Sequence, residues 1–262
     1  MAKKRECRIL AVVNQKGGVG KTTTSVNLCA YLALAGQHVL LVDCDAQSNA
    51  TSGVGVDKMT VASGLYDVLV DDAPIASIVH RDVAGIKGFD LAPATLDLSG
   101  AEMVLYSEQN FARESVLARA LKSVRDQYDY IVIDAPPSLG LITINVLTAA
   151  QGLVIPIQCE YYALEGIEQL MDVIQLIRRS LNPTLEIDVV VLTMQDYRTN
   201  LSQQVVTDVR AFFGDKVAEL PIPRNVRLSE APSHGKPISL FDPKSKGAAA
   251  YKQLAEEVIE RT

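Results

Sequence analysis

The sequence predicts an α/β protein in which helices cover both faces of a mostly parallel, twisted sheet. Two observations favour this fold class. Short, continuously apolar runs alternate with helical patterns from one end of the chain to the other, as is typical of strands buried on both faces. The 262 residues are 48% hydrophobic and 21% charged, which suits one large core. Because no linker or repeat interrupts the pattern, we expect a single domain over residues 1–262.

The first half of the chain alternates between the two kinds of element. Strands are expected at 9–13, 39–42, 89–92 and 130–133, and helices at 21–35 and 115–125. The strands are assigned to runs of Val, Ile and Leu, which are too short for buried helices. Gly36 ends the first helix, because glycine readily adopts the left-handed conformation that closes a helix.

The second half continues the alternation. Strands are expected at 153–157, 187–192 and 217–220, and helices at 164–180, 203–213 and 245–261. The turn Asn182-Pro183 closes the long amphipathic helix before it, because proline cannot continue a helix. Residues 221–243, rich in proline and polar groups, are predicted to be an ordered loop.

Several classes of protein are excluded by simple features of the chain. No apolar run approaches the roughly 18 residues of a membrane span, and the run at 9–13 is too short for a secretory signal, so a cytoplasmic location is expected. The acidic residues near the C-terminus, at 256, 257 and 260, predict no membrane partner, since anionic lipid would repel them. The four cysteines form no CxxC pair and are predicted to be reduced core thiols.

A glycine-rich loop, NQKGGVGKT at 14–22, lies between the first predicted strand and helix. Its glycines let the backbone wrap with N–H groups pointing inward, and the helix N-terminus adds positive potential. Lys21 is suited to the β- and γ-phosphates of a nucleotide, and the Thr22 hydroxyl to Mg²⁺. The candidate nucleotide-binding residues of the loop are Gly17, Gly18, Val19, Gly20, Lys21, Thr22 and Thr23.

Carboxylates follow two of the predicted strands, at the edge of the sheet where ligands bind. Asp43 and Asp45 follow the second strand, and Asp134 follows the strand 130–133. An apolar strand that ends in Asp suits Mg²⁺ coordination, through water in the case of Asp134. Taken alone, each pattern is also compatible with a simple turn, and only their combination with the phosphate loop favours a magnesium site.

The charge distribution leaves two interpretations open. The net charge of −6 argues against a protein that coats nucleic acid along its whole surface. Within 224–246, five basic residues accompany only Glu230 and Asp242. This segment is either a local basic patch or a solvated loop with scattered charges.

The loop differs from the standard phosphate-loop motif, since Gln15 stands where the first glycine would be and a second lysine, Lys16, follows it. The stretch KGGVGKT resembles the deviant Walker A motif of the ParA/MinD superfamily of P-loop ATPases. DAPPS at 134–138 and the segments 160–166, 196–200 and 222–232 are similar to the Soj-type ParA partition ATPases. These ATPases usually have D-x-D-P-Q-G-N after the second strand, where this chain has Ala46 and Ser48 in place of proline and glycine.

The resemblance implies a Mg²⁺-dependent ATPase that works as an ATP-dependent homodimer. It implies that Lys21 serves the nucleotide of its own subunit, that Lys16 reaches the nucleotide of the partner, and that Asp45 orients the attacking water. It also implies stimulation by a ParB-type partner and nonspecific binding of double-stranded DNA on the nucleoid. The residues matched by position are Arg198, Arg224 and Arg227 for DNA and Pro223 for the base pocket. A nucleotide-gated adaptor for a protein cargo, without DNA binding, is the alternative.

Overall fold

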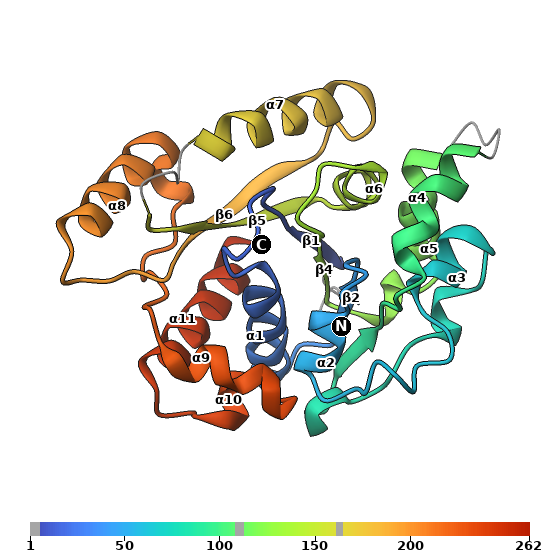
Figure 1. The fold of residues 1–262 in the computed structure, drawn as a ribbon, viewed down its shortest axis with the longest axis horizontal. Coiled ribbons are helices and arrows are strands. Elements are labelled where there is room, and N and C mark those ends of the chain that lie inside the picture. Colours follow the sequence, from blue (N-terminus) through green and yellow to red (C-terminus); the bar gives the residue numbers. More distant parts are fainter. Residues whose placement is uncertain (1–5, 108–112, 161–164) are drawn as a thin grey trace, which may run out of the picture.

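The predicted sheet is confirmed by the computed structural model, which describes residues 6–107, 113–160 and 165–262 (Figure 1). In these residues the strands are β1 (Arg8–Val12), β2 (Val39–Asp43), β3 (Phe89–Ala92), β4 (Tyr130–Asp134), β5 (Gly152–Gln158) and β6 (Glu186–Thr193). They form one six-stranded sheet in the order β3-β2-β4-β1-β5-β6, and every pairing is parallel. All carboxyl ends of the strands therefore lie at one edge.

Helices cover both faces of the sheet (Figure 1). The α-helices are α1 (Lys21–Leu34), α2 (Asn49–Gly53), α3 (Leu65–Val70), α4 (Leu98–Ser107), α5 (Val116–Lys122), α6 (Leu141–Ala149), α7 (Glu165–Ser180), α8 (Asn200–Phe213), α9 (Val226–Glu230), α10 (Ile238–Phe241) and α11 (Lys246–Arg261). Short 3-10 helices lie at Ile75–Ser77, Val83–Gly85, Arg113–Ser115, Arg125–Gln127, Gly214–Lys216 and Ala231–His234.

Two hydrophobic layers explain why the strands are continuously apolar. Successive side chains of a strand point to opposite faces. Ile9 and Ala11 of β1 thus pack with α3 to α8, while Leu10 and Val12 pack in the other layer, which includes α1 and α11. Each fully buried Val, Leu or Ile contributes about 1.5–3 kcal/mol. Polar residues within these strands would therefore be costly, except where the strands end.

The C-terminal part of the chain corrects two predictions. The strand predicted at 217–220 is wrong, because only Val217 forms a bridge, to Val190 of β6. Pro221 and Pro223 follow directly, and proline lacks the N–H that a continued ladder needs. The loop predicted over 221–243 contains the short helices α9 and α10. The predicted helix start at Leu164 lies outside the described residues.

Together with α9 and α10, the helices α2, α3, α4 and α6 were not predicted, and the helix expected at 115–125 is shorter, since α5 covers Val116–Lys122. The four cysteines are buried free thiols, as expected. In the part of the chain that the structure describes, no helix has the length and apolar character to cross a membrane. That residues 1–262 form a single domain stays a prediction.

Candidate nucleotide-binding site

The site lies where the carboxyl ends of three adjacent strands meet. In the parallel register, Val12 at the end of β1 pairs with Asp134 at the end of β4. Asp134 in turn pairs with Asp43 at the end of β2. The loop that follows β1 leads directly into α1, so its backbone lies beside both carboxylates. The fold therefore brings together the phosphate-loop motif and the two strand-end acids that the sequence analysis selected.

The side chain of Asn14 holds the start of the phosphate loop in place. The Asn14 amide donates to the carbonyl of Pro156 (2.8 Å), and its oxygen accepts from the Lys16 N–H (2.9 Å). Gly18 and Gly20 have φ values of 76° and 90°, which L-residues rarely adopt. At Gly17 and Gly18 an added Cβ would meet nothing within 4 Å, so the loop leaves open space where a ligand could sit.

The Lys21 side chain folds back across the loop. Its ammonium donates to the carbonyl of Lys16 (3.1 Å), which links the two lysines, and the residue is only 7% exposed. Burial lowers the pKa of Lys21, while the neighbouring carboxylates of Asp134 and Asp45 raise it. Lys16 itself is half-buried. A buried lysine at a helix N-terminus, with few competing partners, is prepared for a phosphate group.

Asp134 is fully buried and incompletely satisfied. Its Oδ1 accepts from the Ser25 hydroxyl (2.8 Å), whereas Oδ2 has no hydrogen-bond partner among the described residues. Burial, followed by the charge of Asp43, raises the pKa of Asp134, and the Thr22 and Ser25 hydroxyls and Lys21 lower it. An orphaned buried carboxylate oxygen is costly. A cation would remove that cost, so the site fits Mg²⁺.

The donor set also suits magnesium. No cluster of three or more His, Cys, Asp or Glu side chains occurs in the described residues. Mg²⁺ is commonly held by one or two protein oxygens, waters and the phosphates of the substrate. The Thr22 hydroxyl and Asp134 would supply the protein oxygens here.

Asp43 has a different environment from Asp134. Its Oδ1 accepts from the Asp45 N–H (3.1 Å), and its Oδ2 accepts from the N–H and the hydroxyl of Thr51 (both 2.8 Å). Burial raises its pKa, and the bonds from Thr51 and Asp45 lower it. The carboxylate therefore fastens the loop after β2 to the first residues of α2. Its predicted role as a metal ligand stays a prediction.

The loop after β2 carries the predicted water-orienting residue. Asp45 is half-buried, and its Oδ1 accepts from the Gln47 N–H (2.9 Å). Ser48 is the N-cap of α2 and has φ 56° and ψ 38°, in the left-handed region. That conformation favours glycine, the residue that the sequences resembled by this loop usually have at this position. Ser48 adopts this conformation at some cost in strain.

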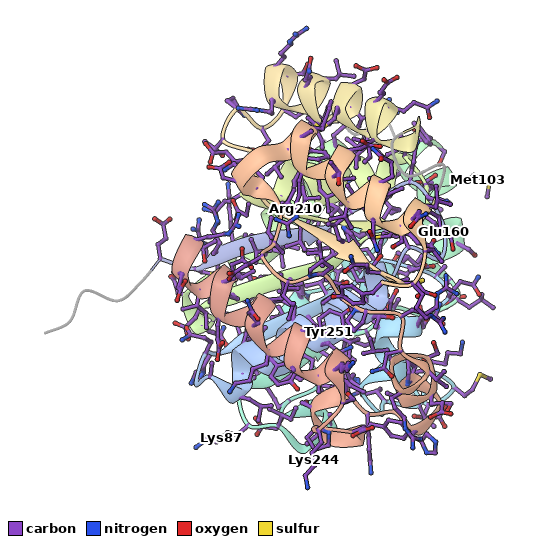
Figure 2. The ribbon with its side chains drawn as sticks, turned by 90° about the vertical axis from the view of Figure 1, so that its left-hand side faces the viewer. Lys87, Met103, Glu160, Arg210, Lys244 and Tyr251 are labelled. Atoms are coloured by element: carbon purple, nitrogen blue, oxygen red, sulfur yellow. The ribbon has the colours of Figure 1, made fainter. Side chains whose placement is uncertain are left out.

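A cavity of about 420 Å³ adjoins the loop on its other side. It is lined by the predicted Pro223, by Gly20 and Thr23 of the loop and α1, and by Thr193, Met194, Ile222, Arg224, Asn225, Val226, Leu228, Ser229, Pro232 and Tyr251. In Figure 2, Tyr251 of α11 lies within the body of the protein, whereas Lys244 projects outward. The mixture of apolar walls and polar groups suits a nucleotide base and ribose. Sequence reasoning missed Thr193 and Met194, which belong to no motif.

Each of the three arginines predicted to bind DNA is paired with a carboxylate. Arg224 lines the cavity, Arg227 lies in α9, and Arg198 lies on the loop after β6. The Nε–H and an Nη2–H of Arg198 donate to the two carboxylate oxygens of Asp196 (2.9 and 2.7 Å). This pairing holds the pKa of Asp196 well below its usual range. Two further ion pairs join Arg224 to Glu160 (3.1 Å) and Arg227 to Glu230 (2.9 Å). Two of the five basic residues in 224–246 are thus paired with acids, and Glu160, the partner of Arg224, comes from a distant segment.

A glycine loop at a helix N-terminus, a buried lysine and an unpaired strand-end carboxylate together define a P-loop nucleotide-binding protein. Residues 7–187 match the family model described as an AAA domain. The chain is 56% identical, over 96% of its length and 98% of the relative, to the sporulation initiation inhibitor protein Soj of Bacillus subtilis. It is 51% identical to the chromosome partitioning protein ParA of Caulobacter vibrioides, over 97% of this chain and 94% of that one. The chain belongs to the ParA/Soj family of P-loop ATPases.

Solved structures agree with the fold. The cobyrinic acid a,c-diamide synthase from Mycobacterium smegmatis, with bound ADP and magnesium, is 37% identical and gives a TM-score of 0.84, covering 97% of this chain and 94% of that one. The septum site-determining protein MinD from Pyrococcus horikoshii, complexed with Mg-ADP, is 27% identical and gives a TM-score of 0.77, with 96% of both chains covered. Both relatives hold a magnesium nucleotide on the same fold.

Proposed function

We propose that this chain is an ATP-driven partition ATPase that segregates DNA. The observation that carries the proposal is its similarity over nearly the whole length to Soj and ParA proteins. The orphaned oxygen of Asp134 supports it, because a buried unsatisfied carboxylate oxygen is costly unless a cation binds, and the phosphate loop leaves open space for a nucleotide. The reaction is the hydrolysis of ATP to ADP and phosphate in the cytoplasm.

Each residue of the site has a role in this proposal. Lys21 neutralises charge on the β- and γ-phosphates, and Thr22 and Asp134 hold Mg²⁺, Asp134 through water. Asp45, at the mouth of the site, orients the attacking water. The base lies in the cavity lined by Pro223. Mg²⁺ supplies charge neutralisation on the phosphates, which phosphoryl transfer requires.

Lys16 distinguishes this loop from a standard phosphate loop. The side chain of Lys21 is already directed to the chain's own loop, through the Lys16 carbonyl. We assign Lys16 to the nucleotide of a second subunit, so that hydrolysis requires an ATP-dependent homodimer. A cation that arrives only on dimerisation adds charge stabilisation that one loop cannot supply. Stimulation by a ParB-type partner would then open the dimer on the nucleoid.

Nonspecific DNA binding is assigned to Arg198, Arg224 and Arg227. Guanidinium groups that pair with carboxylates, as Arg198 does through two nitrogens, are equally suited to phosphates. Binding to DNA must therefore exchange acids for phosphates. This exchange predicts that the acidic partners weaken DNA binding.

The test is binding of a random-sequence DNA duplex by the chain with ATP, ADP or no nucleotide, at several salt concentrations. We expect binding with ATP that weakens steeply with salt. Arg198→Glu should lower the affinity by roughly tenfold or more, whereas Arg178→Glu on the exposed surface of α7 makes the same charge change as a control. Asp196→Asn should raise the affinity a few-fold more than Glu256→Gln, which also removes one negative charge.

Two results would contradict the proposal. One is DNA binding that does not depend on ATP, and the other is an equal affinity for DNA in Arg198→Glu and Arg178→Glu. Either result would favour a nucleotide-gated adaptor for a protein cargo. Equal effects of Asp196→Asn and Glu256→Gln would show that the carboxylate next to Arg198 does not compete with DNA.

A further inference from the structure

Thr193, the last residue of β6, lies directly against the phosphate loop although 174 positions separate it from Val19. Its hydroxyl donates to the carbonyl of Val19 (2.8 Å), and the residue is only 2% exposed. Its methyl group is 3.8 Å from the point where a Cβ on Gly20 would lie. Thr193 thus contacts the loop at the two residues that precede Lys21.

The position of this bond matters because the peptide group is planar. When the carbonyl of Val19 is held on one side, the N–H of Gly20 must point to the other side. Gly20 has φ 90°, a conformation open to glycine among several others, so the bond from Thr193 selects one orientation of a peptide next to a flexible residue. The hydroxyl therefore fixes the direction of one of the backbone N–H groups that line a phosphate loop.

Thr193 is itself held firmly. Its backbone carbonyl accepts from the Cys159 N–H (3.0 Å), and it pairs in register with Gln158 of β5. The next residue, Met194, has φ 53°, a strained conformation for a side chain of its size. Both residues line the base cavity. The end of β6 therefore touches the phosphate loop and the base cavity at once.

We propose that Thr193 is a positioning residue for nucleotide binding: its hydroxyl orients the Val19–Gly20 peptide so that the phosphate loop is preformed before the nucleotide arrives. The inference rests on the proposed nucleotide binding at this loop, and it adds a residue from the far edge strand to the site. Preorganised donors bind without the cost of rearranging the loop.

The test compares Thr193→Val, which keeps the shape and removes the hydroxyl, with Thr193→Ser, which keeps the hydroxyl. Thr148→Val is the matched control, because the Thr148 hydroxyl also donates to a backbone carbonyl, that of Ile144 (2.7 Å), within α6. The affinity for ADP with Mg²⁺ is measured by calorimetry, and the stability of each variant by urea unfolding.

We expect Thr193→Val to bind ADP roughly tenfold more weakly than the unchanged chain, a difference of about 1.4 kcal/mol. Thr193→Ser should retain most of the affinity, and Thr148→Val all of it. If Thr193→Val loses stability but binds ADP like the unchanged chain, the hydroxyl is merely structural and the inference is wrong. Loss of affinity in Thr193→Ser equal to that in Thr193→Val would overturn it as well, since the methyl would then be the determinant. Failure of the unchanged chain to bind ADP would instead refute the proposed function.

Discussion

The buried carboxylate of Asp134 should make the nucleotide-free protein less stable as the pH rises. Burial and the neighbouring Asp43 raise its pKa from the ordinary value of 3.8 to about 7. The pKa of this carboxyl is higher in the folded than in the unfolded state. At any pH between the two pKa values, the folded protein therefore binds more protons than the unfolded chain. Stability is therefore lost as the pH rises from about 4 to about 7, and the loss is complete above that range.

The size of the stability loss follows from the shift in the pKa of Asp134. About three pH units, at about 1.4 kcal/mol each, give a ceiling on the order of 4 kcal/mol. Water and side chains relax around a buried charge and so reduce the destabilisation below this ceiling. We therefore expect ionised Asp134 to lower the free energy of unfolding by about 2 kcal/mol. Asp134→Asn removes the charge and keeps the shape. It should therefore be about 2 kcal/mol more stable than the unchanged chain at pH 8, and this advantage should shrink as the pH falls and nearly vanish only near pH 4.

The assay is urea unfolding of both proteins without nucleotide, at pH 4, 5, 6, 7 and 8. Asp188→Asn is the matched control, since Asp188 is also a buried carboxylate on a strand but is paired with Arg8 (2.7 Å). Its neutralisation should destabilise the protein at pH 8, because it leaves the arginine without its partner. If Asp134→Asn is the less stable protein at pH 8, or if its advantage does not grow with pH, the account of the site is wrong.

Two further predictions concern the loops of the site. Ser48→Gly should stabilise the protein by about 0.5 kcal/mol, because relief of the left-handed strain exceeds the entropy cost of glycine. Ser52→Gly, inside α2, should instead destabilise it by about 1 kcal/mol, and urea unfolding that ranks the two variants in the opposite order would contradict the reasoning. Lys16→Ala should keep ADP affinity within about twofold and lower the rate of ATP hydrolysis by about 100-fold, measured as phosphate release, with the exposed Lys87→Ala as control. Normal turnover by Lys16→Ala would exclude the cross-subunit role.

Most of the sheet could be predicted because its strands are buried on both faces. Runs such as ILAVV at 9–13 and YIVI at 130–133 lack the alternation of apolar and polar residues that a half-exposed strand shows. The location of the site could then be predicted as well. The phosphate loop and the acids come directly after such strands, and the carboxyl ends of parallel strands lie at one edge of the sheet. The helix α6 was missed because its sequence LITINVLTA is apolar on nearly all sides, so it lacks the periodicity that indicates a helix.

The parts that the sequence did not reveal depend on contacts between distant segments. The short helix α2 is held by the bond from Thr51 to Asp43, which no local pattern indicates. The acid that neutralises Arg224 is Glu160, so the local charge count over 224–246 overestimated the basic character of the segment. Thr193 belongs to no motif, and only the packing of β6 against the phosphate loop places it in the site.

The central claim is that two copies of the chain close around their nucleotides, each with Lys16 directed to the other. The most direct test is the mass of the protein in solution, by light scattering, with Mg²⁺ and a non-hydrolysable ATP analogue or with ADP. The account predicts twice the 28.4 kDa of one chain with the analogue and a single chain with ADP. A single chain in both conditions, from a preparation that hydrolyses ATP at its full rate, would contradict it.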